Sequence, residues 1–278
     1  MSKATGILLG IGSALRNKAG PILAREFSRR SRALVRFFEV RMETLIPCWI
    51  ALMLLATALK VVTAPSGTGT LFVGLTMSLP FLALAASPVL GYRIAAGAFP
   101  RGRIGEQPMV RLARWGRWRQ APGGEIRRAA ITGPAGFLVS LIAGILLNVP
   151  VRSLEFLAVV PAINPADPYW AQVLLVTMTF DVVLMNFLYM VCFVMALRGA
   201  PLFPRLLVLA WVLDVVLQMT IARVIGATDF PTMLAQPLVG FLDGNMKKVM
   251  ISVALWLPYL LLSDQVNLLF RHRVRAAA

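Results

Sequence analysis

Six long stretches of mostly apolar residues, separated by short polar segments, form the main pattern along this chain. A helix needs about 20 such residues to cross a hydrocarbon core of about 30 Å. The sequence therefore predicts an all-α integral membrane protein, a six-helix transmembrane bundle. The predicted spans are Leu45–Ala64, Leu71–Tyr92, Ile131–Val149, Ala171–Leu197, Leu206–Gly226 and Val249–Phe270.

Composition strengthens this prediction. Of the 278 residues 58% are hydrophobic and only 14% are charged, whereas about a quarter of a typical soluble protein is charged. These values argue against a water-soluble enzyme, and they exclude a disordered chain because disorder requires low hydrophobicity.

The formal net charge of +16 is unevenly distributed. Segments 1–43, 93–129, 198–205 and 269–278 carry 23 of the 28 Lys and Arg residues, and all four lie on one side of the predicted bundle. Cytoplasmic loops of membrane proteins are enriched in basic residues. We therefore expect both termini in the cytoplasm (N-in/C-in) of a bacterial inner (plasma) membrane. The remaining basic residues, expected outside, are Lys60, Arg152, Arg223, Lys247 and Lys248.

The charge pattern divides the chain into five regions, and no separate soluble domain is expected. The short apolar segments Val151–Pro161 and Phe230–Phe241 are predicted to rest on the outer interface or against the bundle. The five regions are a basic interfacial N-terminal segment (1–43), a two-helix hairpin (44–92), an Arg/Trp-rich cytoplasmic loop (93–129), a four-helix bundle (130–270) and a basic tail (271–278).

Two basic segments contain interleaved aromatic residues, which is typical of segments lying in the headgroup layer. We expect the first to be an amphipathic helix that then turns into the first span. Anionic lipid or a membrane-protein partner is the predicted ligand of these surfaces; a nucleic-acid-binding arm is the less favoured alternative. The residues concerned are Arg29, Arg30, Arg32, Arg36, Arg111, Arg114, Trp115, Arg117, Trp118 and Arg119.

Small residues recur at helical spacing in two predicted spans, which favours close helix packing, within the chain or with a partner. In the third span the pattern continues to Asn148. The packing residues are Thr132, Gly136, Ser140 and Gly144 in the third span, and Ala83, Ser87 and Gly91 in the second.

Two acidic residues, Asp181 and Asp214, fall near the middle of neighbouring predicted spans, where a carboxylate costs about 2.5–3.5 kcal/mol and must face the bundle interior. One interpretation is a proton- or cation-responsive site, because like-charged buried carboxyls can share or relay a proton. The other is that each aspartate only joins helices. Further polar residues that can take part are Thr177, Asn186, Tyr189 and Gln218.

Searches for catalytic and metal-binding patterns are negative. His272 is the only histidine, and Cys48 and Cys192 are the only cysteines, too few for the usual metal sites or nucleophile–histidine arrangements. No phosphate-binding, dinucleotide-binding or metalloprotease motif is present. We expect no cofactor, no metal and no enzymatic activity.

The last third of the chain contains two local motifs. Leu202-Phe203-Pro204-Arg205-Leu206 opens the fifth span, and Trp256-Leu257-Pro258-Tyr259 is followed by Ser263 and Val266. Over about residues 131–270 the chain resembles a functionally uncharacterised family of small bacterial inner-membrane proteins with W-x-P-Y-[FL]-x-x-S-x-x-V in the last helix. It departs from that pattern at Asp264 and Gln265, where the family has basic residues. The resemblance implies a helical bundle and no reaction.

Two functions remain open from the sequence. The favoured hypothesis is an accessory or assembly subunit that binds other membrane proteins and anionic lipid. The alternative is a small proton- or cation-coupled transporter or channel that uses Asp181 and Asp214.

Overall fold

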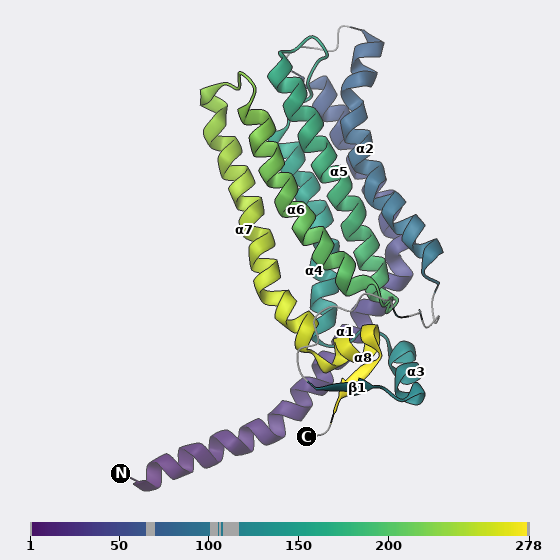
Figure 1. Ribbon diagram of the computed structural model, residues 1–278, viewed down its shortest axis with the longest axis vertical. Helices are drawn as coiled ribbons and strands as arrows, with labels where there is room; N and C mark the ends of the chain where they lie inside the picture. The colour runs from purple at the N-terminus through teal and green to yellow at the C-terminus, as the bar shows by residue number, and fades with distance from the viewer. Residues whose placement is uncertain (1, 65–69, 101–104, 106, 108–116, 277–278) are drawn as a thin grey trace.

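The computed structural model describes residues 2–64, 70–100, 105, 107 and 117–276, with side chains from residue 29 onward. Its main body is a bundle of six long helices that run alternately up and down (Figure 1). Each of the six is long and apolar enough to cross a membrane, in agreement with the predicted multi-pass protein. They are α1 (Ser2–Val62), α2 (Leu71–Ala98), α4 (Phe137–Val159), α5 (Tyr169–Leu197), α6 (Phe203–Gly226) and α7 (Thr232–Leu262).

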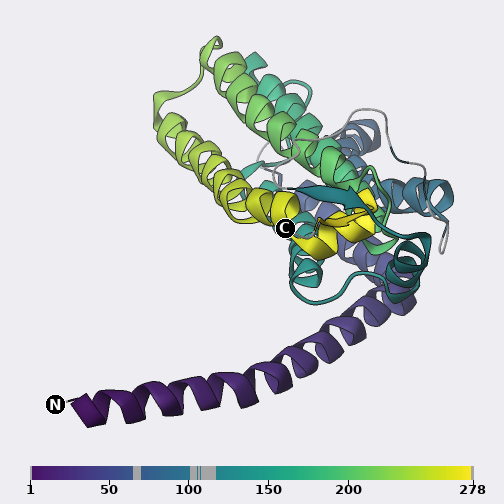
Figure 2. The same ribbon diagram turned by 60° about the horizontal axis from the view of Figure 1, so that its bottom comes forward.

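Four short elements cover one end of the bundle and form what we call the end cap (Figures 1 and 2). They are β1 (Trp118–Gln120), α3 (Gly123–Thr132), α8 (Asp264–Arg271) and β2 (Arg273–Arg275). The two strands pair antiparallel, so that Trp118 lies opposite Arg275. Part of the predicted Arg/Trp loop therefore pairs with part of the predicted basic tail.

Helix α5 is the centre of the bundle, because it contacts α2, α4 and α6. It approaches α2 closely at Gly91, where a Cβ would lie 2.7 Å from the carbonyl oxygen of Phe187. At the end opposite the cap, Lys60 Nζ donates a 3.2 Å hydrogen bond to the carbonyl of Val160 and so joins α1 to the end of α4.

The third long helix differs from its predicted bounds. Residues 131–132 end α3, and Gly133 and Gly136, with φ of 69° and 58°, form the turn into α4. Positive φ is readily adopted by glycine. Helix α4 then continues past Pro150 to Val159. The prediction of a separate outer segment at Val151–Pro161 was therefore wrong, and Arg152 lies inside a long apolar helix.

The sixth predicted span was also misplaced. Helix α7 already begins at Thr232, so Phe230–Phe241 is no separate interfacial segment and Lys247 and Lys248 lie within the helix. It ends at Leu262 because Ser263 is extended and caps α8, its Oγ accepting from the backbone N–H of Val266.

The first long helix is continuous from Ser2 to Val62, without the predicted turn before the first span. Among its described side chains, contact with the rest of the chain begins near Ser31, which is 4% exposed and whose Oγ accepts a 2.9 Å hydrogen bond from the backbone N–H of Gly136, and apolar packing follows at Phe38 and Met42. The preceding part projects away from the other helices (Figures 1 and 2). The basic segment and the first membrane-spanning segment therefore form one continuous helix.

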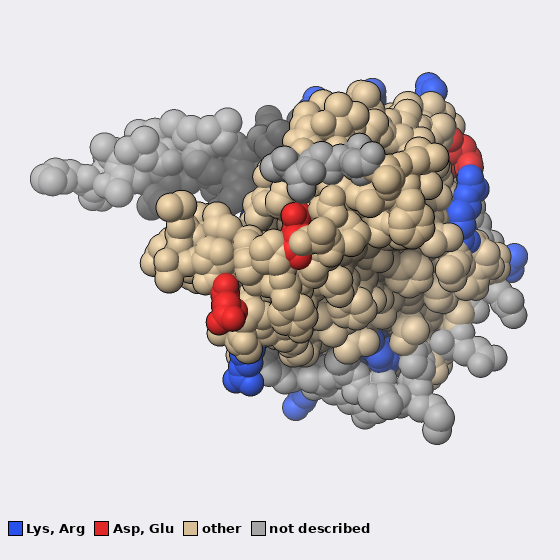
Figure 3. All heavy atoms as spheres, turned by 90° about the horizontal axis from the view of Figure 1, so that it is seen from above, with Lys and Arg blue, Asp and Glu red and all other residues tan. Residues whose placement is uncertain are grey.

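Much of the lateral surface is apolar, including the strongly exposed Leu55, Phe72 and Ile251. Such a surface suits contact with lipid rather than water. Viewed from the end opposite the cap, the described surface is mostly uncharged, with charged residues at only a few places (Figure 3). The end cap, in contrast, contains Arg119, Arg127, Arg273 and Arg275.

Candidate functional site

A buried cluster of charged side chains joins three helices at the centre of the bundle. Arg152 of α4 binds both predicted aspartates, Asp181 of α5 and Asp214 of α6. Its Nη2 lies 2.7 Å from Asp181 Oδ2 and 2.9 Å from Asp214 Oδ1, and its Nη1 lies 2.8 Å from Asp214 Oδ2. We call Arg152, Asp181 and Asp214 the Arg–Asp–Asp cluster.

The predicted polar neighbours Tyr189 and Gln218 complete the cluster. The Tyr189 hydroxyl donates to Asp214 Oδ2 at 2.9 Å. The Gln218 amide donates to Asp181 Oδ2 at 3.2 Å and reaches Asp214 Oδ1 at 3.5 Å. These bonds fix the orientation of both carboxylates, since ionised carboxylates act only as acceptors.

The cluster is shielded from solvent and its formal charges do not balance. Arg152 is 5% exposed, Asp181 1% and Asp214 0%. One guanidinium faces two carboxylates, which leaves one surplus negative charge when all three are ionised. A buried charge is tolerated only with compensation, so this imbalance is the main electrostatic property of the site.

Local sequence explains how the three charges meet. A short connection between Leu197 and Phe203 makes α5 and α6 antiparallel neighbours, so their central residues face each other as predicted. Arg152 lies seven residues from the end of α4, about 10 Å along the axis. Because a helical Cβ tilts toward the helix N-terminus, the guanidinium is directed back toward the middle of the bundle.

The other two predicted polar residues lie outside the cluster. Asn186 donates to Ser153 Oγ at 2.9 Å, and Ser153 in turn donates to the carbonyl of Val149. Thr177 donates to carbonyl groups within its own helix. Asn186 therefore joins α5 to α4 beside the cluster, while Thr177 contributes only locally.

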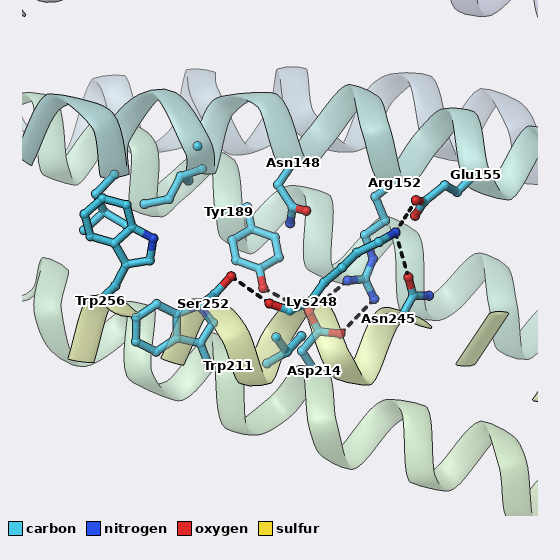
Figure 4. A pocket seen from close by; sticks show the side chains of 14 residues that line it. Asn148, Arg152, Glu155, Tyr189, Trp211, Asp214, Asn245, Lys248, Ser252 and Trp256 are labelled. Atoms are coloured by element: carbon cyan, nitrogen blue, oxygen red, sulfur yellow. Dashed lines mark hydrogen bonds and ion pairs between the residues drawn. The ribbon is translucent and has the colours of Figure 1, made fainter. Parts of the chain in front are cut away.

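A polar groove between α4 and α7 leads to the cluster and encloses a cavity of about 130 Å³. Asp214 and Arg152 lie on its wall, whereas Asp181 lies behind Arg152 and does not line it. Figure 4 shows charged side chains at one end and two tryptophans at the other. The lining residues are Leu141, Gly144, Ile145, Asn148, Arg152, Glu155, Tyr189, Trp211, Asp214, Asn245, Lys248, Val249, Ser252 and Trp256.

A second ion pair crosses the groove near the charged end. Lys248 of α7 binds Glu155 of α4, and its Nζ also lies 3.5 Å from Asn245 Oδ1 (Figure 4). The side chains of Lys248 and Glu155 are 51% and 30% exposed. This pair is accessible, unlike the Arg–Asp–Asp cluster behind it.

The sequence interpretation missed Arg152, Glu155 and Lys248 as site residues, because it placed all three outside the spans. A signal was present for the first. Gly144, Asn148 and Arg152 follow the same four-residue spacing as the predicted small-residue stripe, so extending the stripe by one turn leads to the buried arginine.

Only some residues of the two predicted small-residue stripes lie at helix contacts. Gly91 forms the close contact with α5 described above, and Ser87 is also buried, but Ala83 is exposed. In the third span the stripe is wrong as a single helical face, because Thr132 belongs to α3 and Gly136 precedes α4. Ser140 and Gly144 are exposed, and a Cβ at Gly144 would meet no described atom within 4 Å.

The predicted basic surface is described only in part. Arg29, Arg30, Arg32 and Arg36 are exposed along α1. Arg117 and Arg119 are also exposed, while Trp118 lies 5.1 Å from the guanidinium of Arg273 and 5.8 Å from that of Arg275. Arg111, Arg114 and Trp115 lie outside the described residues.

The residues of the C-terminal motif have structural contacts. Trp256 and Tyr259 pack around Phe137 of α4, with ring centroids 4.9 and 5.2 Å away. Pro258 lies inside α7, Ser263 caps α8 and Val266 is fully buried. At the first motif, Pro204 is in the first turn of α6, a favoured position for proline, and Arg205 donates to the carbonyl of Pro201.

Among the residues that the structure describes, no group of three or more His, Cys, Asp or Glu side chains is arranged to hold a metal ion. Comparisons with protein-family models, with curated proteins and with solved structures gave no match. The resemblance over residues 131–270 therefore stays a prediction.

Proposed function

We propose that this protein is a small proton- or cation-coupled membrane transporter whose coupling site is the Arg–Asp–Asp cluster. The observation that carries the proposal is the surplus negative charge of a buried cluster that borders a polar groove. In this function the protein binds its ligand and moves it chemically unchanged.

The surplus negative charge of the cluster favours binding of a cation. In the low-dielectric interior a carboxylate without full compensation is costly, by about 2.5–3.5 kcal/mol on insertion scales. A proton on one carboxyl, or a monovalent cation beside it, removes the imbalance. Asp214 lies on the wall of the groove and is the carboxylate of the cluster nearest to it, while Asp181 is linked to Asp214 through Arg152.

Coupling also requires a contact that differs between the loaded and unloaded states. Arg152 divides its donors between carboxylates on two helices. When either carboxylate is neutralised, the guanidinium interacts more strongly with the other one, which changes the forces between α4, α5 and α6. Binding can in this way alter the packing of three helices.

Proton flux into liposomes tests this proposal. The full-length protein is reconstituted with a pH-sensitive dye inside, and a potassium gradient with valinomycin supplies the driving potential. We expect flux above that of protein-free liposomes, and at least a tenfold decrease in Asp181→Asn with an unchanged elution profile. Asp243→Asn is the matched control, because its carboxylate is 55% exposed and pairs with Lys247 away from the cluster. Parent protein indistinguishable from empty liposomes, or an Asp181→Asn variant as active as the parent, would overturn the proposal.

An accessory subunit is a second candidate, favoured by the projecting part of α1. This segment extends well beyond the bundle (Figure 2), and Arg29, Arg30, Arg32 and Arg36 are exposed where α1 reaches the rest of the chain, which suits contact with anionic lipid or a partner. Purification in mild detergent tests this candidate. A stoichiometric partner that is lost when residues 2–28 are deleted would support it, and a solitary monomer would contradict it.

We further propose a bacterial inner membrane with both termini cytoplasmic. The basic end cap and the described basic residues Arg198 and Arg205 lie at the same end of the bundle, which agrees with the positive-inside rule. A reporter fused after residue 278 should be active only when it is one that functions in the cytoplasm. Activity of a periplasm-specific reporter at that position would reverse the orientation.

A further inference from the structure

We propose that the α4–α7 groove binds a small organic ammonium ion that carries a short apolar group. The ammonium lies between Asp214 and Glu155, and the apolar group lies against Trp211 and Trp256. This inference rests on the proposed function and deepens it, because it names the chemical class of the ligand at the same site.

The charged side chains around the groove favour a positively charged ligand. Five charged side chains line the groove or lie directly behind it. Arg152 and Lys248 are positive, and Asp181, Asp214 and Glu155 are negative, so the set is one positive charge short. A monovalent cation balances it, whereas an anion increases the imbalance in a poorly solvated space.

Hydrogen-bonding capacity is also available. Asp214 Oδ1 accepts one short bond from Arg152 at 2.9 Å and a long one from Gln218 at 3.5 Å, although a carboxylate oxygen can accept two good ones. An ammonium group in the groove can donate a hydrogen to Glu155, whose side chain is 30% exposed, while the carboxylate of Asp214, 0% exposed, attracts it through its charge. The buried Nε of Arg152 has no partner among the described residues, and it can donate to a water or a ligand hydroxyl beside the cation.

The other half of the groove indicates an organic cation rather than a metal ion. Trp211 and Trp256 lie at the end opposite Glu155 and Asn245 (Figure 4). Indole faces pack against the apolar or aromatic substituent of such a cation, and an aromatic pair contributes about 0.5–1.5 kcal/mol beyond the area that it buries. A hydrated inorganic cation makes no use of this apolar half, whereas an alkyl or aryl ammonium uses both halves at once.

The cavity volume limits the size of the ligand. About 130 Å³ is available, slightly less than the roughly 150 Å³ of an engineered protein cavity that binds benzene. Benzylammonium or an alkylammonium of similar length is therefore near the upper limit. Lys248 extends across the groove to Glu155, so a longer ligand has to displace this side chain.

The test uses the purified full-length chain in detergent, with tryptophan fluorescence as readout and benzylammonium as probe. Benzyl alcohol, which has nearly the same shape and no charge, is the matched control ligand. We expect saturable quenching by benzylammonium only, and loss of the signal in Trp211→Phe.

Variants locate the bound charge. Asp214→Asn and Glu155→Gln each remove the surplus negative charge and should weaken benzylammonium binding at least tenfold, while Asp243→Asn should bind like the parent. If Asp214→Asn does not fold, Glu155→Gln decides, because that side chain is partly exposed and its loss leaves the buried cluster intact. Equal binding of benzyl alcohol, no saturable binding by the parent, or parent-like affinity in Glu155→Gln would each overturn the inference.

The binding assay needs no ion gradient, so it fails independently of the flux assay. Ammonium binding without proton flux overturns only the proposal that the protein is a transporter. Proton flux that depends on Asp181, without ammonium binding, overturns only the proposal that the α4–α7 groove binds an organic ammonium ion.

Discussion

Replacement of Arg152 by methionine tests the energetic role of the buried cluster. Methionine is similar in length and suits an apolar interior, but it removes the partner of both Asp181 and Asp214 together with hydrogen bonds of 2.7 to 2.9 Å. Removal of one member of a buried ion pair costs about 3–5 kcal/mol, because an uncompensated charge remains. Two carboxylates remain here, so we expect a loss at the upper end of that range.

The triple variant Arg152→Met, Asp181→Asn, Asp214→Asn provides the matched control. It contains no charge at the site, and fully neutralised buried clusters are often as stable as the charged original. We expect it to recover most of the lost stability. Reversible unfolding in mixed micelles, followed by circular dichroism, measures both variants. A single variant within about 1 kcal/mol of the parent, or a triple variant no more stable than the single one, would refute the reasoning.

Three further predictions concern other parts of the molecule. Gly91→Leu should destabilise the bundle, because its Cβ alone would lie 2.7 Å from the carbonyl oxygen of Phe187. Gly144→Leu, in contrast, should melt at the same temperature as the parent, since a Cβ at this position has no described neighbouring atom within 4 Å. Burial lowers the pKa of His272, so the unfolded chain binds its proton more tightly. Stability should therefore fall as the pH drops through about 6.5, the unfolded value, and this dependence should be weaker in His272→Asn, since asparagine tolerates the left-handed conformation. Trp118→Ala removes contacts with two arginine guanidinium groups and should speed hydrogen exchange in β2 by several-fold, at about 0.5–1 kcal/mol per contact.

The bounds of a helix were predicted best from the sequence where a long apolar run had clear ends. The helix Tyr169–Leu197 and its neighbour Phe203–Gly226 lie within three residues of their predicted bounds, because polar turns and prolines delimit them. The central positions of Asp181 and Asp214 followed directly from that placement, and their proximity followed from the short connection.

The errors occurred where a charged residue or a proline interrupts an apolar run. Pro150 and Arg152 suggested the end of a span, but Pro150 is accommodated within α4 and Arg152 is compensated by carboxylates of two other helices. Such compensation is a tertiary property and cannot be read from one segment. The end of α7 depends in the same way on Asn267, whose amide donates to the carbonyls of Leu261 and Ser263.

The strand pair of the end cap had no usable sequence signal. Each strand has only three residues, and the two are far apart in the chain. Strands this short carry no measurable alternation of apolar and polar residues, and their pairing depends on the bundle that brings both segments to the same end.

The connectivity of the Arg–Asp–Asp cluster also has a consequence for the order of events during biosynthesis. Arg152 precedes Asp181 by 29 residues and Asp214 by 62, so α4 is made before either counter-charge exists. An arginine alone in the bilayer costs about 2.5–3.5 kcal/mol on insertion scales, and this cost persists until α5 follows. Helices α4 and α5 are therefore expected to leave the insertion machinery as a pair. Helix α6 then packs against this hairpin, in which Asp181 already neutralises Arg152.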